Sequence, residues 1–354
     1  MSSPPAPELP GIKHLVSVGP NAGAHLVAIR SGVAALVPLL VLWALDRVDL
    51  ASFAILAATG AVFGRNAALG RRLVMQLQTT TVLVLLIVGG AASNDAGLPG
   101  WGIVLATALV AGVCSAAADI LRWTPSGCLF FVFAFAVSAS TDSASTSPSL
   151  IAITAATTAL FTVFVTFCGA AIELAVRRWC QNAIETTQIA PPSRLQPAVI
   201  SAHASVCFIA AAAAGMLSLA GGLAHPYWAM VSAIVPVAGS TTLGQLTRSV
   251  HRLLGTFLGI GVTAMILFGS PDTLLLIFVL AVLTAGTELM VARNYGLAML
   301  FLTPLTISMM FLNNPQPLGP ILADRAVETC IGLAVVNVLI VLTHSVRHPS
   351  DRIK

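Results

Sequence analysis

A chain of 354 residues with 57% hydrophobic and only 8% charged residues cannot cover a water-facing surface, since about a quarter of the residues of a soluble protein are charged. Its formal net charge of +4 comes from basic residues scattered between apolar runs, a distribution that does not indicate a nucleic-acid partner. The composition predicts an integral membrane protein, with membrane lipid as its surroundings.

Apolar runs between polar residues predict about twelve transmembrane helices, because a helix needs about 20 mostly apolar residues to cross the hydrocarbon layer. We therefore expect an all-α integral membrane protein. The predicted segments span residues 26–46, 50–64, 73–92, 101–121, 126–140, 150–176, 198–220, 226–239, 250–270, 273–290, 294–312 and 321–343.

The basic residues predict the orientation of these helices, because cytoplasmic loops retain Lys and Arg. With the N-terminus inside, all but two of the 17 basic residues fall on the cytoplasmic side, and the exceptions are Arg47 and Arg325. Both termini are therefore expected in the cytoplasm. At the cytoplasmic rim we expect Asp119 to pair with Arg122, and Glu288 with Arg293.

The order of the first six segments recurs in the last six. Residues 72–80 align with residues 248–256 at an offset of 176, and the second segment of each half is too short to span a bilayer. Gly60 interrupts one of these short segments and Pro236 the other. Paired short, broken helices are typical of transport sites. We therefore expect two parallel six-helix repeats, with short broken second helices in each half that line a polar gap.

This pattern divides the chain into five predicted parts. The two membrane repeats are flanked by a disordered N-terminal tail and a C-terminal tail, both cytoplasmic, and are joined by a short cytoplasmic linker. The predicted parts are a tail of residues 1–24, a first repeat of residues 25–176, a linker of residues 177–197, a second repeat of residues 198–345 and a tail of residues 346–354.

The second half carries a series of short motifs. They are His225-Pro226-Tyr227-Trp228, a loop with Gly239 and Gly244, Arg252-Leu253-Leu254-Gly255-Thr256 with Gly259, Arg293-Asn294-Tyr295-Gly296 running to Thr303-Pro304, and Asp324-Arg325 ahead of Gly332. This set, over residues 225–340, resembles the fusaric acid resistance (aromatic acid exporter) family. The first half carries only a degraded version of it, because no motif like Pro226-Tyr227-Trp228 precedes residues 50–64.

The resemblance implies export of aromatic or other organic carboxylates across the inner (plasma) membrane, driven by the proton gradient. Related plant malate channels, which share the six-helix unit and work as dimers, imply a passive anion channel as the alternative. This sequence departs from many such exporters because its central linker leaves no room for a large cytoplasmic domain. A homodimer or an accessory envelope subunit is therefore open as a partner.

Three residues at the start of the last predicted helix are the first candidates for a site. Spacings of three and four residues place Asp324 and Arg325 on the same side of the helix as Glu328. Arg325 could bind a carboxylate through two hydrogen bonds, and Glu328 and Asp324 could carry the coupling proton. The alternative is an ion network that only fixes the twelfth helix.

Four further residues are candidates in the second half. His203 suits proton coupling, although a lone His in an apolar helix is more often a packing residue. Arg252 could receive an anion from the cytosol, or could serve only to orient its helix. Tyr227 and Trp228 could stack on an aromatic substrate, or could anchor the eighth segment at the headgroups.

The sequence carries no phosphate loop, HExxH or GxSxG motif, so we expect no enzyme, no cofactor and no metal site. The leading hypothesis is a secondary exporter of small organic anions. A passive anion channel and a non-transporting membrane scaffold or envelope-assembly subunit remain as alternatives. A proton-carrying acid in the membrane separates a pump from a channel.

Overall fold

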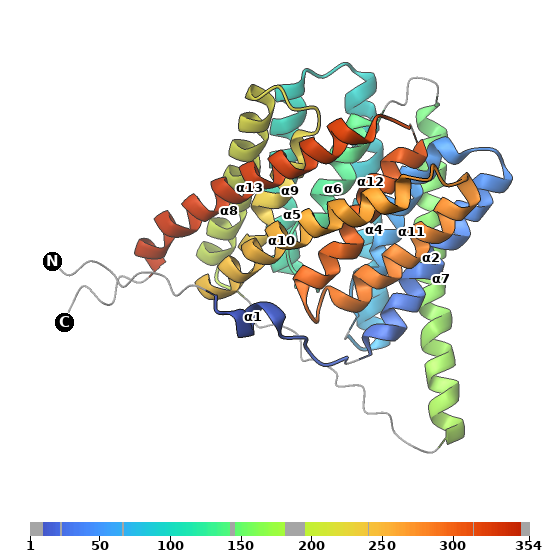
Figure 1. Ribbon diagram of the computed structural model, residues 1–354. Coiled ribbons are helices and arrows are strands. Elements are labelled where there is room, and N and C mark those ends of the chain that lie inside the picture. Colours follow the sequence, from blue (N-terminus) through green and yellow to red (C-terminus); the bar gives the residue numbers. More distant parts are fainter. Residues whose placement is uncertain are drawn as a thin grey trace.

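The computed structural model describes residues 10–21, 23–65, 67–141, 146–180, 195–239, 241–313 and 315–347, without the side chains of residues 173–180 and 343–347. Every regular element in these residues is a helix (Figure 1). The helices are α1 (Ile12–Val16), α2 (Ala24–Ala44), η1 (Val48–Leu50), α3 (Ala51–Ala58), η2 (Thr59–Val62), α4 (Leu69–Asp95), α5 (Gly100–Leu121), α6 (Leu129–Ser140), α7 (Pro148–Cys180), α8 (Pro197–Ala220), α9 (Pro226–Ile234), η3 (Pro236–Ala238), α10 (Thr242–Leu267), α11 (Thr273–Met290), α12 (Tyr295–Asn313) and α13 (Leu318–Arg347).

Nine helices in the described part of the chain are long and apolar enough to cross a membrane. They are α2, α4, α5, α7, α8, α10, α11, α12 and α13. Three shorter apolar helical stretches complete the set, over residues 48–62, 129–140 and 226–238. Each of the twelve predicted segments thus coincides with a helical element, but only nine of them meet the length of a membrane span.

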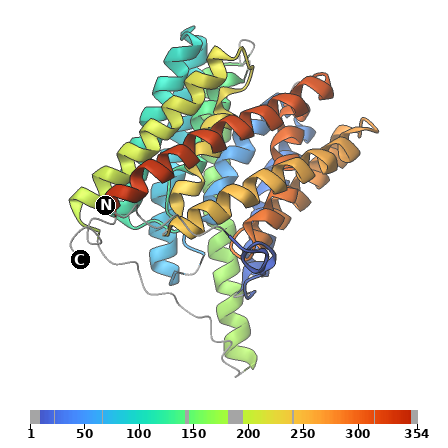
Figure 2. The same cartoon turned by 60° about the vertical axis from the view of Figure 1, so that its left-hand side comes forward.

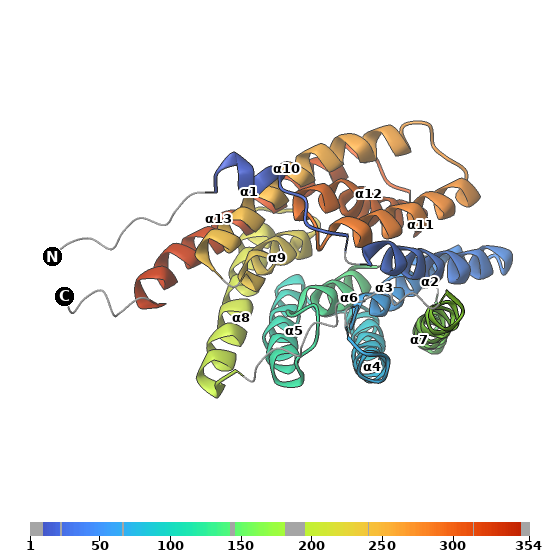
Figure 3. The ribbon, with the colours of Figure 1, turned by 90° about the horizontal axis from the view of Figure 1, so that it is seen from below.

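The longer helices and α6 form a closed ring of neighbours, seen from below in Figure 3. Its order is α8, α5, α6, α4, α7, α2, α11, α12, α10 and α13, which returns to α8. Each of the second five helices is the counterpart, in the other half of the chain, of the helix at the same place among the first five. The pairs are α8 with α2, α5 with α11, α6 with α12, α4 with α10 and α7 with α13. The same types of contact therefore occur twice around the ring. The C-terminal part of α7 projects beyond its neighbours in two views (Figures 1 and 2).

The two short segments, α3 with η2 and α9 with η3, pack inside this ring. Each changes from an α-helix to a 3-10 helix, at Thr59 in the first half and at Pro236 in the second. The side chains of α3 and α9 are buried and belong largely to one hydrophobic cluster. The expectation that both line an open polar gap is therefore wrong for this conformation, because apolar side chains from the surrounding helices close over them. A cluster of polar side chains lies at the start of α9.

A buried glutamine stabilises the end of each short segment. The side-chain amide of Gln76 donates to the carbonyl oxygens of Ala61 and Phe63, at 3.3 and 3.2 Å. That of Gln245 donates to the carbonyl oxygens of Val237 and Gly239, at 3.5 and 3.1 Å. The two glutamines lie 169 positions apart, so the expected alignment of residues 72–80 with 248–256 is wrong by seven residues in this helix.

Three other boundaries differ from the prediction. The helix α6 is shorter than a membrane span, because the chain before it forms a loop in which Gly127 has a φ of +105°. The helix α10 begins eight residues before the predicted start, since the Thr241 hydroxyl caps it by accepting from the Gly244 N–H. Residues 10–21 of the predicted N-terminal tail contain the short helix α1, whereas most of the predicted linker and residues 348–354 lie outside the described residues.

Close packing of α13 against α9 depends on Gly332. A Cβ atom at this position would lie 2.2 Å from the Ala229 carbonyl oxygen and 2.7 Å from the Ser232 Cβ. We expect Gly332→Ala to destabilise the protein by about 1–3 kcal/mol, because overpacked helices must separate. Thermal unfolding in detergent checks this, with Gly319→Ala as the control because that Cβ in the same helix meets nothing within 4 Å. Equal unfolding temperatures for the two variants would contradict the packing role.

An ion pair joins the two halves. Arg65, in the loop after η2, donates to Glu288 of α11 at 2.7 Å, and the two side chains are 12% and 6% exposed. Glu288 therefore does not pair with Arg293 as expected, because Arg65 reaches it from the other half of the chain.

Removing Arg65 should leave the buried Glu288 carboxylate without its cation. We expect Arg65→Gln to cost about 3–5 kcal/mol of stability, and the double variant Arg65→Gln/Glu288→Gln to cost clearly less. The unfolding temperatures of the purified single and double variants, measured without chemical denaturant, check this prediction. Additive losses in the double variant would show that the pair is not coupled.

Candidate functional site

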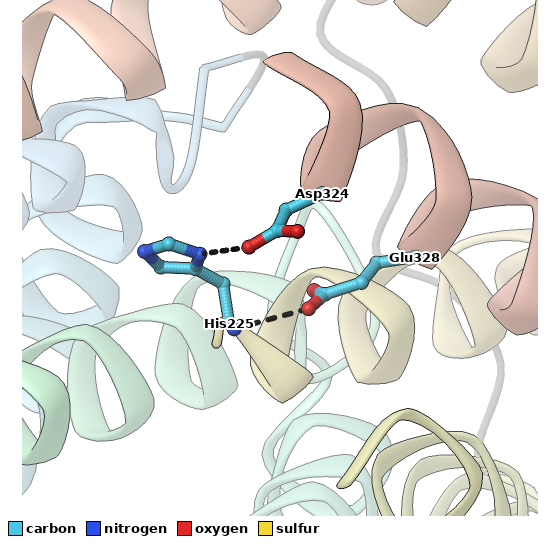
Figure 4. Close-up of side chains that lie close together, drawn as sticks. All are labelled: His225, Asp324 and Glu328. Atoms are coloured by element: carbon cyan, nitrogen blue, oxygen red, sulfur yellow. Dashed lines mark hydrogen bonds and ion pairs between the residues drawn. The ribbon is translucent and has the colours of Figure 1, made fainter. Parts of the chain in front are cut away.

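A histidine and two carboxylates meet where α9 begins. Asp324 and Glu328 project from α13 toward His225, the residue before α9 (Figure 4). The His225 ring contacts the Asp324 carboxylate through Nδ1 at 3.1 Å, and the backbone N–H of His225 donates to the Glu328 carboxylate at 3.0 Å. Burial lowers the pKa of His225 while Asp324 opposes that shift. We therefore assign a neutral ring that donates from Nδ1 to the carboxylate.

Helix geometry and the turn into α9 create this arrangement. Asp324 and Glu328 are four residues apart, so both carboxylates leave α13 on one side. Pro226 opens α9 at its first turn, a position where the missing N–H is not needed. The backbone N–H of His225 precedes the helix and is free to donate to the Glu328 carboxylate.

Trp228 and Arg325 extend the cluster into the protein. The Trp228 ring stacks on the His225 ring with centroids 4.6 Å apart, and the Arg325 guanidinium carbon lies 5.1 Å from the Trp228 ring centroid. Trp228 is fully buried and Arg325 is 2% exposed. A cation over an indole face is a favourable contact. It does not satisfy the guanidinium N–H groups.

Three buried polar atoms of this cluster have no hydrogen-bond partner among the described residues. They are Nε of Arg325, Nε1 of Trp228 and Oε2 of Glu328. In addition, no described group forms a hydrogen bond or an ion pair of 4.0 Å or less with the Arg325 guanidinium. Buried polar groups are nearly always paired, so such atoms call for an explanation. Two of the three are donors, as recognition of a carboxylate requires.

Tyr227 packs its ring edge-on against the rings of His225 and Trp228, with centroids 6.0 and 5.6 Å apart, but its hydroxyl points to another helix. It is 3% exposed, and its hydroxyl contacts the Met310 sulfur of α12 at 3.2 Å. Its ring also packs edge-on near Phe133 of α6. Neither Tyr227 nor Trp228 lies at an exposed edge, so a role as headgroup anchors does not fit their burial.

Arg252 of α10 contacts α9 at Ser232, one turn after Trp228. Its Nε donates to the Ser232 hydroxyl at 3.0 Å, and its Nη1 donates to the Tyr295 hydroxyl at 2.7 Å. Ser232 in turn donates to the Trp228 carbonyl oxygen. The expected place of Arg252 at the start of its helix is wrong, because α10 begins at Thr242 and Arg252 is only 1% exposed. Two buried arginines, Arg325 of α13 and Arg252 of α10, therefore contact successive turns of α9.

His203 does not join the cluster. It lies in α8 and contacts the Asp119 carboxylate of α5 at 2.6 Å and the Ser115 hydroxyl at 3.3 Å. Asp119 thus bonds a helix of the other half rather than Arg122. The structure brings together Asp324, Arg325, Glu328 and Trp228, and it places His203 elsewhere.

Sequence reasoning missed His225, Ser232 and Tyr295 as site residues. All three lie in or beside motifs that were noted, but only the packing of α9 against α10, α12 and α13 gives them their partners. The ligand atoms of His225, Asp324 and Glu328 lie within 4.8 Å of one another, a set that could hold a divalent metal ion. The absence of a metal site stays a prediction.

Comparison with known proteins supports the membrane assignment. Residues 207–339 match the family model for fusaric acid resistance protein-like proteins. The resemblance to the fusaric acid resistance family is confirmed over this stretch. The match contains α9 to α12 and every residue of the cluster at the start of α9. The matched stretch thus includes this cluster.

A relative in Bacillus subtilis (strain 168) is similar over a shorter stretch. Ninety-one residues are 38% identical to the uncharacterized membrane protein YvaC. The match covers 26% of this chain and 14% of YvaC, so most of that relative lies outside the comparison. No solved structure matches. These comparisons agree with a membrane protein of several apolar helices.

Proposed function

We propose that this protein is a secondary transporter that exports small organic anions, aromatic carboxylates among them, by proton-coupled transport. The observation that carries the proposal is the Arg325 guanidinium, buried over the Trp228 ring without a hydrogen-bond partner among the described groups. A carboxylate between Arg325 Nε and Trp228 Nε1 would satisfy two buried donors at once. A structural ion network would have paired them internally.

The site also has a group that can carry the proton. Glu328 is fully buried, and only one of its carboxylate oxygens has a partner among the described residues. Binding an anion beside Arg325 and a proton on Glu328 keeps the buried charge low, which links the two events. Asp324, bonded to His225 and 20% exposed, is the route we propose between Glu328 and the outer side.

The repeated helix contacts support a two-repeat architecture. We propose that α2–α7 and α8–α13 are parallel repeats related by a pseudo-twofold axis along the membrane normal. We also propose that the protein lies in the inner (plasma) membrane, with both termini in the cytoplasm. Because the ring is closed and the short segments are covered, we assign the described conformation to an occluded state. We propose Arg252 of α10, which contacts α9 one turn after Trp228, as a second residue that binds the anion.

Flux through proteoliposomes tests the proposal. A panel of labelled benzoate, malate and succinate is loaded and its efflux is followed with and without an imposed pH difference. We expect efflux of at least one carboxylate, accelerated by a proton gradient, and none of the neutral analogue benzyl alcohol above empty liposomes. If no carboxylate moves under either condition, the transport proposal fails.

A further inference from the structure

A second cluster of hydrogen-bond donors lies between the middle of α10 and the start of α12, away from the Trp228 cluster. His251 precedes Arg252 in α10, and Arg293 and Asn294 precede α12. His251 is 8% exposed and Asn294 6%. Arg252 and Tyr295, the next residues along each helix, bond to each other at 2.7 Å. The cluster therefore lies where α10 and α12 are held together.

These donors are occupied by the N-terminal strap, residues 10–21, which includes α1 and lies beside α10 (Figures 1 and 3). The Asn294 amide donates to the carbonyl oxygens of Leu15 and Ser17, at 2.9 and 3.0 Å. His251 contacts the Leu15 carbonyl oxygen through Nε2 at 2.9 Å. Because a carbonyl oxygen can only accept, Nε2 of His251 carries the hydrogen.

Gly19 closes the strap onto the same end of the protein. The Arg293 Nε donates to the Gly19 carbonyl oxygen at 3.1 Å, and the Gly19 N–H donates back to the Arg293 carbonyl oxygen at 2.9 Å. In contrast, the strap buries little of its own surface, since Ile12, Val16 and Val18 are 78, 67 and 47% exposed. The strap is therefore held through hydrogen bonds to its own backbone groups, most of them from side chains of the bundle, rather than by a hydrophobic contact.

The donor set suits an anion better than it suits a peptide. Three side chains, one of them an arginine, all present N–H groups toward carbonyl oxygens of the strap. A carboxylate accepts from the same groups through two charged oxygens, and charge-assisted hydrogen bonds are roughly twice as strong as neutral ones. The Leu15 carbonyl oxygen, which contacts both Asn294 and His251, marks where a carboxylate oxygen would bind.

We infer that His251, Arg293 and Asn294 form an entry site for organic carboxylates at the cytoplasmic end, which the N-terminal strap covers until the anion displaces it. The strap thus competes with the anion for these donors, and its release uncovers the middle of α10 and the start of α12 next to Arg252. The role of this site in export rests on the proposed function, but binding at the site does not.

Hydrogen exchange of the full chain tests this inference. In nanodiscs, saturating benzoate should speed exchange of the Gly19 amide by at least about threefold, because it displaces the strap that protects it. Benzyl alcohol, of nearly the same shape but without charge, should not. The Asn294→Ala chain should show fast exchange at Gly19 with no further response to benzoate.

A strap variant provides the second measurement. Gly19→Pro removes the N–H that bonds to the Arg293 carbonyl oxygen, so we expect benzoate affinity by calorimetry to rise about tenfold, while Val18→Ala has no effect. The same gain is expected with Arg325→Ala in the chain, which separates this site from the transport site. Unchanged Gly19 exchange in benzoate, together with unchanged affinity in Gly19→Pro, would overturn the inference.

Discussion

Replacing Arg325 by alanine is expected to lower the efflux of labelled benzoate from proteoliposomes by about a hundredfold or more. The guanidinium is 2% exposed, and no described group forms a hydrogen bond with it. In our proposal the substrate carboxylate is its partner, and losing one member of such a buried pair costs about 3–5 kcal/mol. A loss of that size corresponds to the expected reduction in rate.

Two further arginine variants make this result specific. Arg325→Lys keeps the charge but loses the planar fork that binds two carboxylate oxygens, so we expect intermediate efflux. Arg248→Ala, an exposed arginine of α10, should leave efflux unchanged. All variants are compared after gel filtration shows the same monodisperse peak. If Arg325→Ala transports benzoate at the rate of the unaltered chain, Arg325 does not bind the substrate.

The helices of this protein could be predicted well from its sequence, and the physical reason is lipid. Long apolar stretches such as α5 and α11 have only one stable structure in a bilayer, so their positions follow from composition. Ends were less certain. The Thr241 cap and the Gly127 turn decide where α10 and α6 begin, and each depends on one side chain or one backbone angle.

Partners across the bundle could not be predicted in the same way. Asp324, Arg325 and Glu328 were found because they are neighbours on one helix. Their contacts with His225 and Trp228 are set by the packing of α13 on α9, which Gly332 permits and which no local pattern encodes. For the same reason Glu288 pairs with Arg65 rather than with the nearby Arg293. Asn294 bonds residues of the strap far away in sequence, contacts that no local pattern could indicate.

The second large effect is expected from Glu328→Gln, which should abolish uphill transport without stopping downhill flux. Glutamine keeps an oxygen for the His225 N–H, and it has nearly the shape of the protonated acid. It cannot release a proton. A pump that couples one proton to each anion can hold about a tenfold gradient per pH unit, since one unit is worth about 1.4 kcal/mol. We expect this accumulation to fall to the level of empty liposomes.

Two controls show whether a loss of uphill transport in Glu328→Gln reflects lost proton coupling: downhill exchange of benzoate, and a matched histidine variant. In Glu328→Gln, exchange of labelled for unlabelled benzoate should persist, because Arg325 and Trp228 are unaltered and Glu328 then acts as a permanently protonated group. His203→Gln should keep its coupling, since His203 bonds Asp119 between α5 and α8, outside the cluster. If Glu328→Gln still accumulates benzoate against its gradient, the proton is carried elsewhere. If the unaltered chain passes benzoate downhill but never accumulates it, the protein is a channel, and the buried acid serves to shape the path of the anion rather than to drive it.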